Sequence, residues 1–140
     1  MAEAIARSLT ASKGMGEVEF RSAGTSTVPG HPASEGALRA AQRHGLILGA
    51  HSSTPLSPEL IAWADLVLTM GPSHLIRVLE LGGDGKSALL GAFARGSDDA
   101  MEPAVPDPYG GNDDEYEATF LTLEAMVTAA LDRCSREEGR

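Results

Sequence analysis

The sequence predicts an α/β fold in which helices cover both faces of a small parallel sheet, as three layers. Three observations support this fold class. Stretches with helical character alternate with short apolar stretches, which is typical of α/β layer folds. The run Leu-Val-Leu-Thr-Met at 66–70 is apolar almost throughout, as expected for a strand that is covered on both faces. The length of 140 residues favours one domain, spanning residues 1–140.

Composition and charge narrow the classes of function. Hydrophobic residues make up 42% of the chain and the formal net charge is −9. The first value is high enough for a packed core, and the second argues against a nucleic-acid partner, because phosphate backbones attract basic surfaces. No apolar run is long enough to cross a membrane, and no signal peptide is visible. Since one cysteine excludes an internal disulfide framework, we expect a cytoplasmic protein.

The first two predicted elements are a helix and a strand. Residues 2–11 are rich in alanine and predict a helix, although no N-cap residue precedes it. Residues 18–23 alternate in polarity and predict a short strand. Residues 24–32 are rich in Gly, Pro, Ser and Thr and predict a loop.

Helix caps and apolar runs define the remaining elements. Ser34 or a neighbouring residue is expected to cap a second helix that runs to about His44 and stops at Gly45, and Ser57 followed by Pro58 is expected to begin a third. Further predicted elements are a strand at 66–70, a helix at 72–81, a weaker strand at 88–90 that reaches Phe93, and a helix at 113–133. In the last helix one face carries apolar residues, namely Tyr116, Phe120, Leu123, Val127 and Leu131.

Only three strands are predicted, and the first of them follows a helix rather than preceding one. In a β-α-β unit the crossover helix packs against the strand before it. No such strand precedes the helix at 2–11. The sheet is therefore expected to lack one strand.

Six short motifs, in this order and spacing, resemble the low-molecular-weight phosphotyrosine phosphatase family, particularly the bacterial branch that includes protein arginine phosphatases. The motifs are Met-Ala-Glu-Ala at 1–4, Arg-Ser-Ala-Gly-Thr at 21–25, His-Gly-Leu at 44–46, His-Ser-Ser at 51–53, Ala-Asp-Leu-Val-Leu-Thr-Met at 64–70 and Asp-Pro-Tyr-Gly-Gly at 107–111. The resemblance runs from residue 1 to about residue 130.

The resemblance implies a four-stranded sheet and a phosphate-binding loop. Family members begin with a central strand and a Cys-x5-Arg loop, which cradles phosphate at a helix N-terminus. Its cysteine attacks phosphorus and its arginine holds the equatorial oxygens. That strand and loop take roughly 12–15 residues, and they would precede Met1. The chain is therefore expected to be an N-terminally truncated domain relative to the family, inactive or nearly so as written.

The resemblance also assigns roles to individual residues. Asp107 matches the general acid that protonates the leaving oxygen and then activates water. The prolines at 106 and 108 would limit the positions of its carboxylate. Tyr109 would line the substrate pocket and stack on an aromatic or guanidinium group. Ser22 and His51 match positions whose side chains support the phosphate loop through hydrogen bonds.

Substrate choice stays open between phosphotyrosine and phosphoarginine. Many family members carry an aromatic residue where this chain has Val28, so the pocket wall would be less aromatic. The loop residue that would help to separate the two substrates lies in the absent segment.

Cys134 satisfies the pattern Cys-x5-Arg together with Arg140, but its surroundings do not suit a nucleophile. Glu137 and Glu138 would place two negative charges in a site for a dianion. No helix follows to supply N-terminal amides. We therefore interpret Cys134 as a helix-end residue. The acidic residues at 113–115 are interpreted as favourable charge at the start of the last helix.

Three functions can be considered for this sequence. The first is a protein phosphatase that works through a cysteinyl-phosphate on a phosphorylated protein, without a cofactor, metal, nucleic acid or membrane. The second is a non-catalytic pseudophosphatase or partner-binding relative, in which exposed sheet edges can drive homo-oligomerisation. The third, an arsenate reductase, needs additional cysteines that relay a disulfide. The histidines at 31, 44, 51 and 74 do not form a zinc-binding spacing.

Overall fold

The computed structural model describes residues 1–14, 17–25, 28–97 and 104–138. Its helices are α1 (Ala2–Ser12), α2 (Glu35–Arg43), α3 (Pro58–Trp63), α4 (Pro72–Glu80), α5 (Leu90–Ala94) and α6 (Asp113–Glu138). Strand β1 (Val67–Thr69) pairs in parallel with β2 (Ser87–Leu89), with Leu68 opposite Ala88. The predicted α/β class with a small parallel sheet is confirmed.

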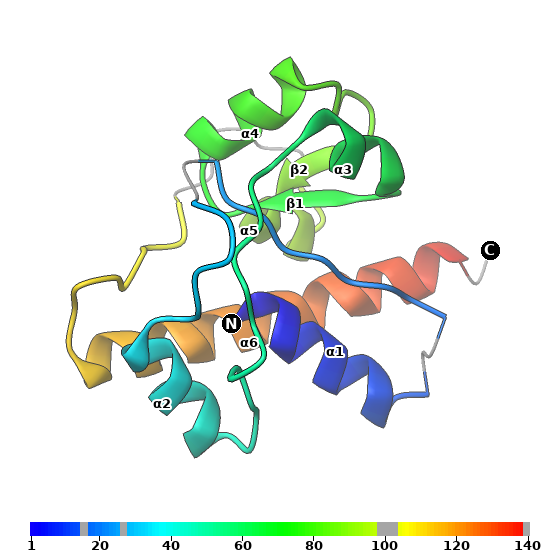
Figure 1. Cartoon of the computed structure of the whole chain (residues 1–140). Helices are drawn as coiled ribbons and strands as arrows, with labels where there is room; N and C mark the ends of the chain where they lie inside the picture. Colours follow the sequence, from blue (N-terminus) through cyan, green and yellow to red (C-terminus); the bar gives the residue numbers. More distant parts are fainter. Residues whose placement is uncertain (15–16, 26–27, 98–103, 139–140) are drawn as a thin grey trace.

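The sheet lies between two layers of helices (Figure 1). Helices α3 and α4 lie on one side, and α1, α2, α5 and α6 lie on the other. Helix α6 is the longest element and packs against α1, α2 and α5. The predicted apolar face of α6 is buried at all five positions (Tyr116, Phe120, Leu123, Val127 and Leu131). The core therefore lies mainly between helices.

The helix caps form as the sequence predicts. The Ser34 hydroxyl accepts a hydrogen bond from the Ala37 amide, and the Ser57 hydroxyl accepts one from the Leu60 amide. Gly45, just past α2, has φ 75°, a conformation that glycine adopts without the penalty of a Cβ atom. Helix α6 extends to Glu138 rather than to residue 133.

The predicted strand at 18–23 is wrong. These residues form no strand, and within the described ranges the nearest ladder contact is the single parallel bridge between Gly24 and Pro55. A strand is stable only when a neighbour accepts and donates its backbone hydrogen bonds. The described residues supply no such neighbour, either here or at the edge of β1 opposite β2.

The weaker strand is correct but shorter than predicted. Residues 87–89 form β2, and the chain then turns at once into α5. Leu90, Ala92 and Phe93 are all buried in α5. A fully buried helix shows no polar face, so the sequence alone does not distinguish it from a buried strand.

Candidate active site

The described part of the loop that carries Asp107 passes the carboxyl end of β1. The amide of Val105 donates a 2.8 Å hydrogen bond to the carbonyl oxygen of Met70, just past that strand. Ala104 passes so close to Gly71 that a Cβ atom at position 71 would lie 3.0 Å from the Ala104 Cβ. Ligands of parallel α/β sheets bind at the carboxyl ends of the strands, so this loop lies where a catalytic group is expected. Residues 98–103 of the predicted acidic loop lie outside the described residues.

Asp107 is exposed, and its carboxylate stabilises a local turn. One carboxylate oxygen, Oδ1, accepts a 3.0 Å hydrogen bond from the amide of Tyr109. The amide of Gly111 donates a 2.7 Å bond to the carbonyl oxygen of Pro108. These two bonds fold the loop on itself and leave the other carboxylate oxygen available to solvent or a substrate.

A hollow of about 230 Å³ lies between this loop and α6. It is lined by Pro106, Asp107, Pro108, Glu115, Ala118, Thr119 and Thr122. Its carboxylates do not favour an anionic phosphate.

Tyr109 is 81% exposed. Its ring is thus available to an incoming group rather than used in the core. The resemblance predicts that this ring lines the substrate pocket, and its role there stays a prediction.

Ser22 is bound to the first turn of α1. Its hydroxyl donates a 2.9 Å hydrogen bond to Oε1 of Glu3, whose other oxygen accepts a 3.1 Å bond from Arg7 Nε. Arg7 also donates to the carbonyl oxygen of Phe20. Glu3 and Arg7 were not identified as site residues from the sequence, although their i, i+4 spacing on a helix was a usable signal.

His51 is half-buried, and its backbone amide donates to the carbonyl oxygen of Leu48. Within the described ranges its ring makes no side-chain hydrogen bond. The next residues contribute more: Ser53 Oγ donates to the carbonyl oxygen of Val28 and accepts from the His31 amide. This serine holds the two neighbouring loops together, and Val28 itself is 62% exposed.

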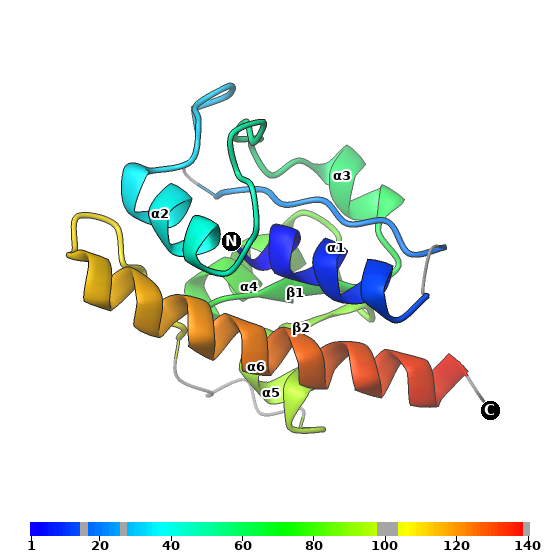
Figure 2. The same ribbon diagram turned by 90° about the horizontal axis from the view of Figure 1, so that it is seen from below.

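The N-terminal end of α1 points to the side of the molecule that carries α2 and the Asp107 loop, in both views (Figures 1 and 2). Met1 is the N-cap residue and makes no side-chain capping bond. The first amides of a helix lack partners within the helix and carry partial positive charge. Burial lowers the pKa of the Met1 amino group, while Glu3 opposes that shift.

Cys134 lies far from this region. It is a residue of α6 that packs, partly buried, against the core. From Asp113 to Cys134 the helix rises by about 30 Å, at about 1.5 Å per residue. Cys134 is thus within a helix and at the opposite end from Asp107, which supports its rejection as the nucleophile.

A second hollow, of about 410 Å³, lies between α1 and the segment at 18–21. Its lining consists of Arg7, Thr10, Ala11, Val18, Glu19, Phe20 and Arg21. None of the four predicted site residues lines this hollow. It lies beside residues 18–23, which form no strand.

Comparison with known proteins identifies this arrangement. The family model described as low molecular weight phosphotyrosine protein phosphatase matches residues 1–139. The chain belongs to this family. It is 30% identical to the low molecular weight protein-tyrosine-phosphatase Etp of Escherichia coli strain K12, over 85% of this chain and 78% of that protein.

Relatives named as arginine phosphatases have the same sequence identity to this chain. The chain is 30% identical to the protein-arginine-phosphatase of Geobacillus stearothermophilus, over 96% of this chain and 88% of that protein. A crystal structure of a YwlE mutant from Bacillus subtilis superimposes with a TM-score of 0.86 at 32% identity, covering 96% of this chain and 88% of that one. The family, the fold and the phosphatase class are therefore established, as the sequence motifs predict.

Within the described ranges, no helix is both long and apolar enough to cross a membrane.

Proposed function

We propose that Asp107 is the general acid of a phosphatase reaction that proceeds through a cysteinyl-phosphate on a phosphorylated protein. The observation that carries this proposal is the position of Asp107. It lies in a loop attached to the carboxyl end of β1, with one carboxylate oxygen outside the local turn. A general acid must reach the leaving oxygen, and such a position allows it to do so.

The nucleophile is proposed to come from a Cys-x5-Arg loop ahead of Met1, in a longer form of the chain. Such a loop would end at the start of α1, where the free helix amides stabilise a phosphate dianion. Ser22 and Glu3 would support it from one side, His51 from the adjoining loops, and the Tyr109 ring would contact the substrate. The chain as written is proposed to be inactive or nearly so.

Both phosphotyrosine and phosphoarginine remain candidate substrates. Relatives of each type are 30% identical to this chain, and the aromatic wall is reduced at Val28. A cytoplasmic location is part of the proposal, because thiolate chemistry requires a reduced cysteine.

The test compares two forms of the protein. The chain as written and a form extended by the family strand and Cys-x5-Arg loop would be assayed with p-nitrophenyl phosphate, a phosphotyrosyl peptide and a phosphoarginyl peptide. Turnover is expected only from the extended form, and the peptide that it prefers identifies the substrate. Cys134→Ser is the matched control: turnover by the chain as written that is abolished by this change would refute the proposal.

A non-catalytic role is the second candidate, favoured by one specific observation. Strand β1 has an open edge, and the segment at 18–23 has no ladder partner among the described residues. Open edges recruit strands from other chains. If the protein binds a partner or itself in this way, size-exclusion chromatography of the chain as written will show a complex or a dimer.

A further inference from the structure

The loop that carries Asp107 is attached to the molecule at two ends. Its first end is attached to the sheet through the hydrogen bond from Val105 to Met70. Its second end runs directly into α6, where the side chain of Asn112 accepts a 2.9 Å bond from the amide of Glu115. The position of Asp107 therefore depends on how firmly the first turn of α6 is held.

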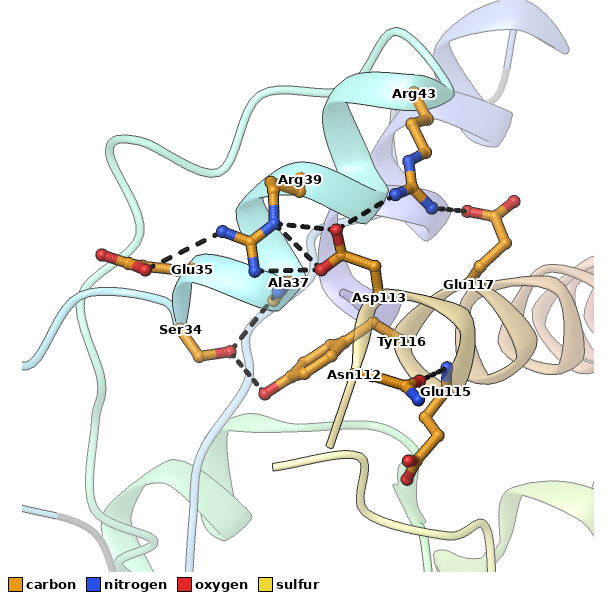
Figure 3. A network of polar contacts seen from close by, with 10 residues as sticks. All are labelled: Ser34, Glu35, Ala37, Arg39, Arg43, Asn112, Asp113, Glu115, Tyr116 and Glu117. Carbon is orange, nitrogen blue, oxygen red and sulfur yellow. Dashed lines mark hydrogen bonds and ion pairs between the residues drawn. The ribbon is translucent and has the colours of Figure 1, made fainter. Parts of the chain in front are cut away.

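Two arginines of α2 hold that first turn (Figure 3). Arg39 binds Asp113 with two donors: its Nε and Nη2 atoms both lie 2.9 Å from Oδ1, and Nε also lies 3.2 Å from Oδ2. Arg43 Nη2 lies 3.3 Å from Oδ2. Both oxygens of Asp113 are thus engaged by guanidinium groups, and these charge-assisted bonds restrict the orientation of the carboxylate.

Arg39 is the more closely coupled of the two. The hydrogen bond and charge of Asp113 raise the pKa of the Arg39 guanidinium above its ordinary value. Glu35, one turn earlier in α2, lies 3.8 Å from Arg39 and also favours its charged form. Since the pair is exposed to solvent, its main effect is geometric rather than a large gain in global stability.

Helix α2 is itself fixed to the core and can serve as a rigid support. Ala37, Ala40 and Ala41 are buried. The ring of Tyr116 packs over Gly36, where no side chain would fit. The Tyr116 hydroxyl group lies 3.1 Å from Ser34 Oγ. The two helices therefore cannot slide past each other without breaking several contacts.

The connection between Asp107 and Asp113 is short, and local contacts restrict it at several points. Pro108 restricts both its own φ angle and the conformation of Asp107 before it. The bonds from Tyr109 to Asp107 and from Gly111 to Pro108 close the intervening turn. Because these two bonds close the turn despite Gly110 and Gly111, we expect a shift at Asp113 to move the carboxylate of Asp107.

We propose that Arg39 is a positioning residue for the general acid: by fixing Asp113, it sets the orientation of the Asp107 loop. This inference rests on the proposed role of Asp107. Arg39 touches neither substrate nor reacting atoms.

The first test needs no catalysis and uses the chain as written. Hydrogen exchange of single amides would be followed by NMR in Arg39→Gln and in the control Arg77→Gln, which removes an ion pair of equal exposure in α4 (52% for both arginines). In Arg39→Gln the amides of Gly111, Glu115 and Tyr116 are expected to exchange several-fold faster. Amides in the middle of α6 should keep their exchange rates. A general loss of stability, by contrast, would accelerate exchange along the whole helix. Unchanged exchange at those three amides would overturn the proposal.

The second test uses the extended, active form. Arg39→Gln is expected to lower kcat for phenyl phosphate, whose leaving group needs a proton, several-fold more than for p-nitrophenyl phosphate, with KM unchanged. Arg39→Lys, which keeps the charge but replaces the planar guanidinium by a single ammonium nitrogen, should recover part of the loss. In the Asp107→Asn background, Arg39→Gln should cause no further loss, since both changes act through one group.

The outcomes separate the two proposals. The first outcome concerns Arg39. If Asp107→Asn changes the ratio of the kcat values for the two esters and Arg39→Gln does not, Arg39 has no positioning role. If Asp107→Asn itself leaves that ratio unchanged, the proposed general acid is wrong, and the exchange experiment alone then shows whether Arg39 anchors the loop.

Discussion

The imidazole ring of His44 lies flat against the ring of Phe120, with centroids 4.1 Å apart and ring planes inclined by only 8°. The same imidazole places Nε2 2.6 Å from Oε1 of Glu117, one turn earlier in α6. Phe120 is 1% exposed. The end of α2 is thereby joined to the N-terminal third of α6 by one stacked contact and one polar contact.

Phe120→Ala is expected to lower the free energy of unfolding by about 3 to 5 kcal/mol, because it removes a buried ring and leaves a cavity. Leu121→Ala, at a neighbouring position that is 49% exposed, should change it by about 0.5 kcal/mol. Urea unfolding followed by circular dichroism measures both. Equal losses in the two variants would mean that Phe120 does not anchor the core.

Gly36→Ala should also destabilise the protein, for a steric reason. A Cβ atom at this position overlaps the ring of Tyr116, and displacing a packed ring costs about 1 to 3 kcal/mol. The control is Gly49→Ala, where the nearest atom is Ile47 Cγ2 at 4.0 Å. We expect the midpoint of urea unfolding to fall in the first variant only. A neutral Gly36→Ala would show that the α2–α6 contact is looser than described.

Asp107→Asn in the extended form should slow hydrolysis of phenyl phosphate by roughly 10² to 10⁴-fold, the usual contribution of a general acid. The effect on p-nitrophenyl phosphate should be smaller, because its leaving group is stable without protonation. Steady-state kinetics with both esters measures the difference. The matched control is Asp114→Asn, an exposed carboxylate of the first turn of α6. If kcat/KM, which reports only the steps up to transfer of the phosphoryl group to the cysteine, falls equally for both esters, Asp107 does not protonate the leaving group.

In a chain that begins at Met1, the amino group should make stability depend on pH. Burial lowers the pKa of this group below its ordinary value of 8.0, so the unfolded chain binds the proton more tightly. Stability should therefore rise with pH through the interval from the lowered pKa up to 8.0 and stay constant above it. The measurement is the urea midpoint across that interval, compared with the N-acetylated chain. Identical pH profiles for the two chains would show that the amino group is solvated.

Local signals in the sequence were sufficient for most helices and for the loop that contains Asp107. Ser34 and Ser57 predicted their caps because a cap is decided within four residues. The strand at 18–23 failed because strand formation depends on a partner that is distant in sequence. The role of Asp113 was missed for the same reason: its arginine partners are 70 and 74 residues away, and the acidic run alone predicted only a favourable helix start.

The placement of the core has a consequence for protein synthesis. Ile5, in the first helix, is buried in the same cluster as Phe120 and Val127, near the other end of the chain. Until α6 has left the ribosome, the apolar faces of α1, α2 and α5 lack the helix that covers most of them. The core of the nascent chain therefore cannot be completed before α6 is available.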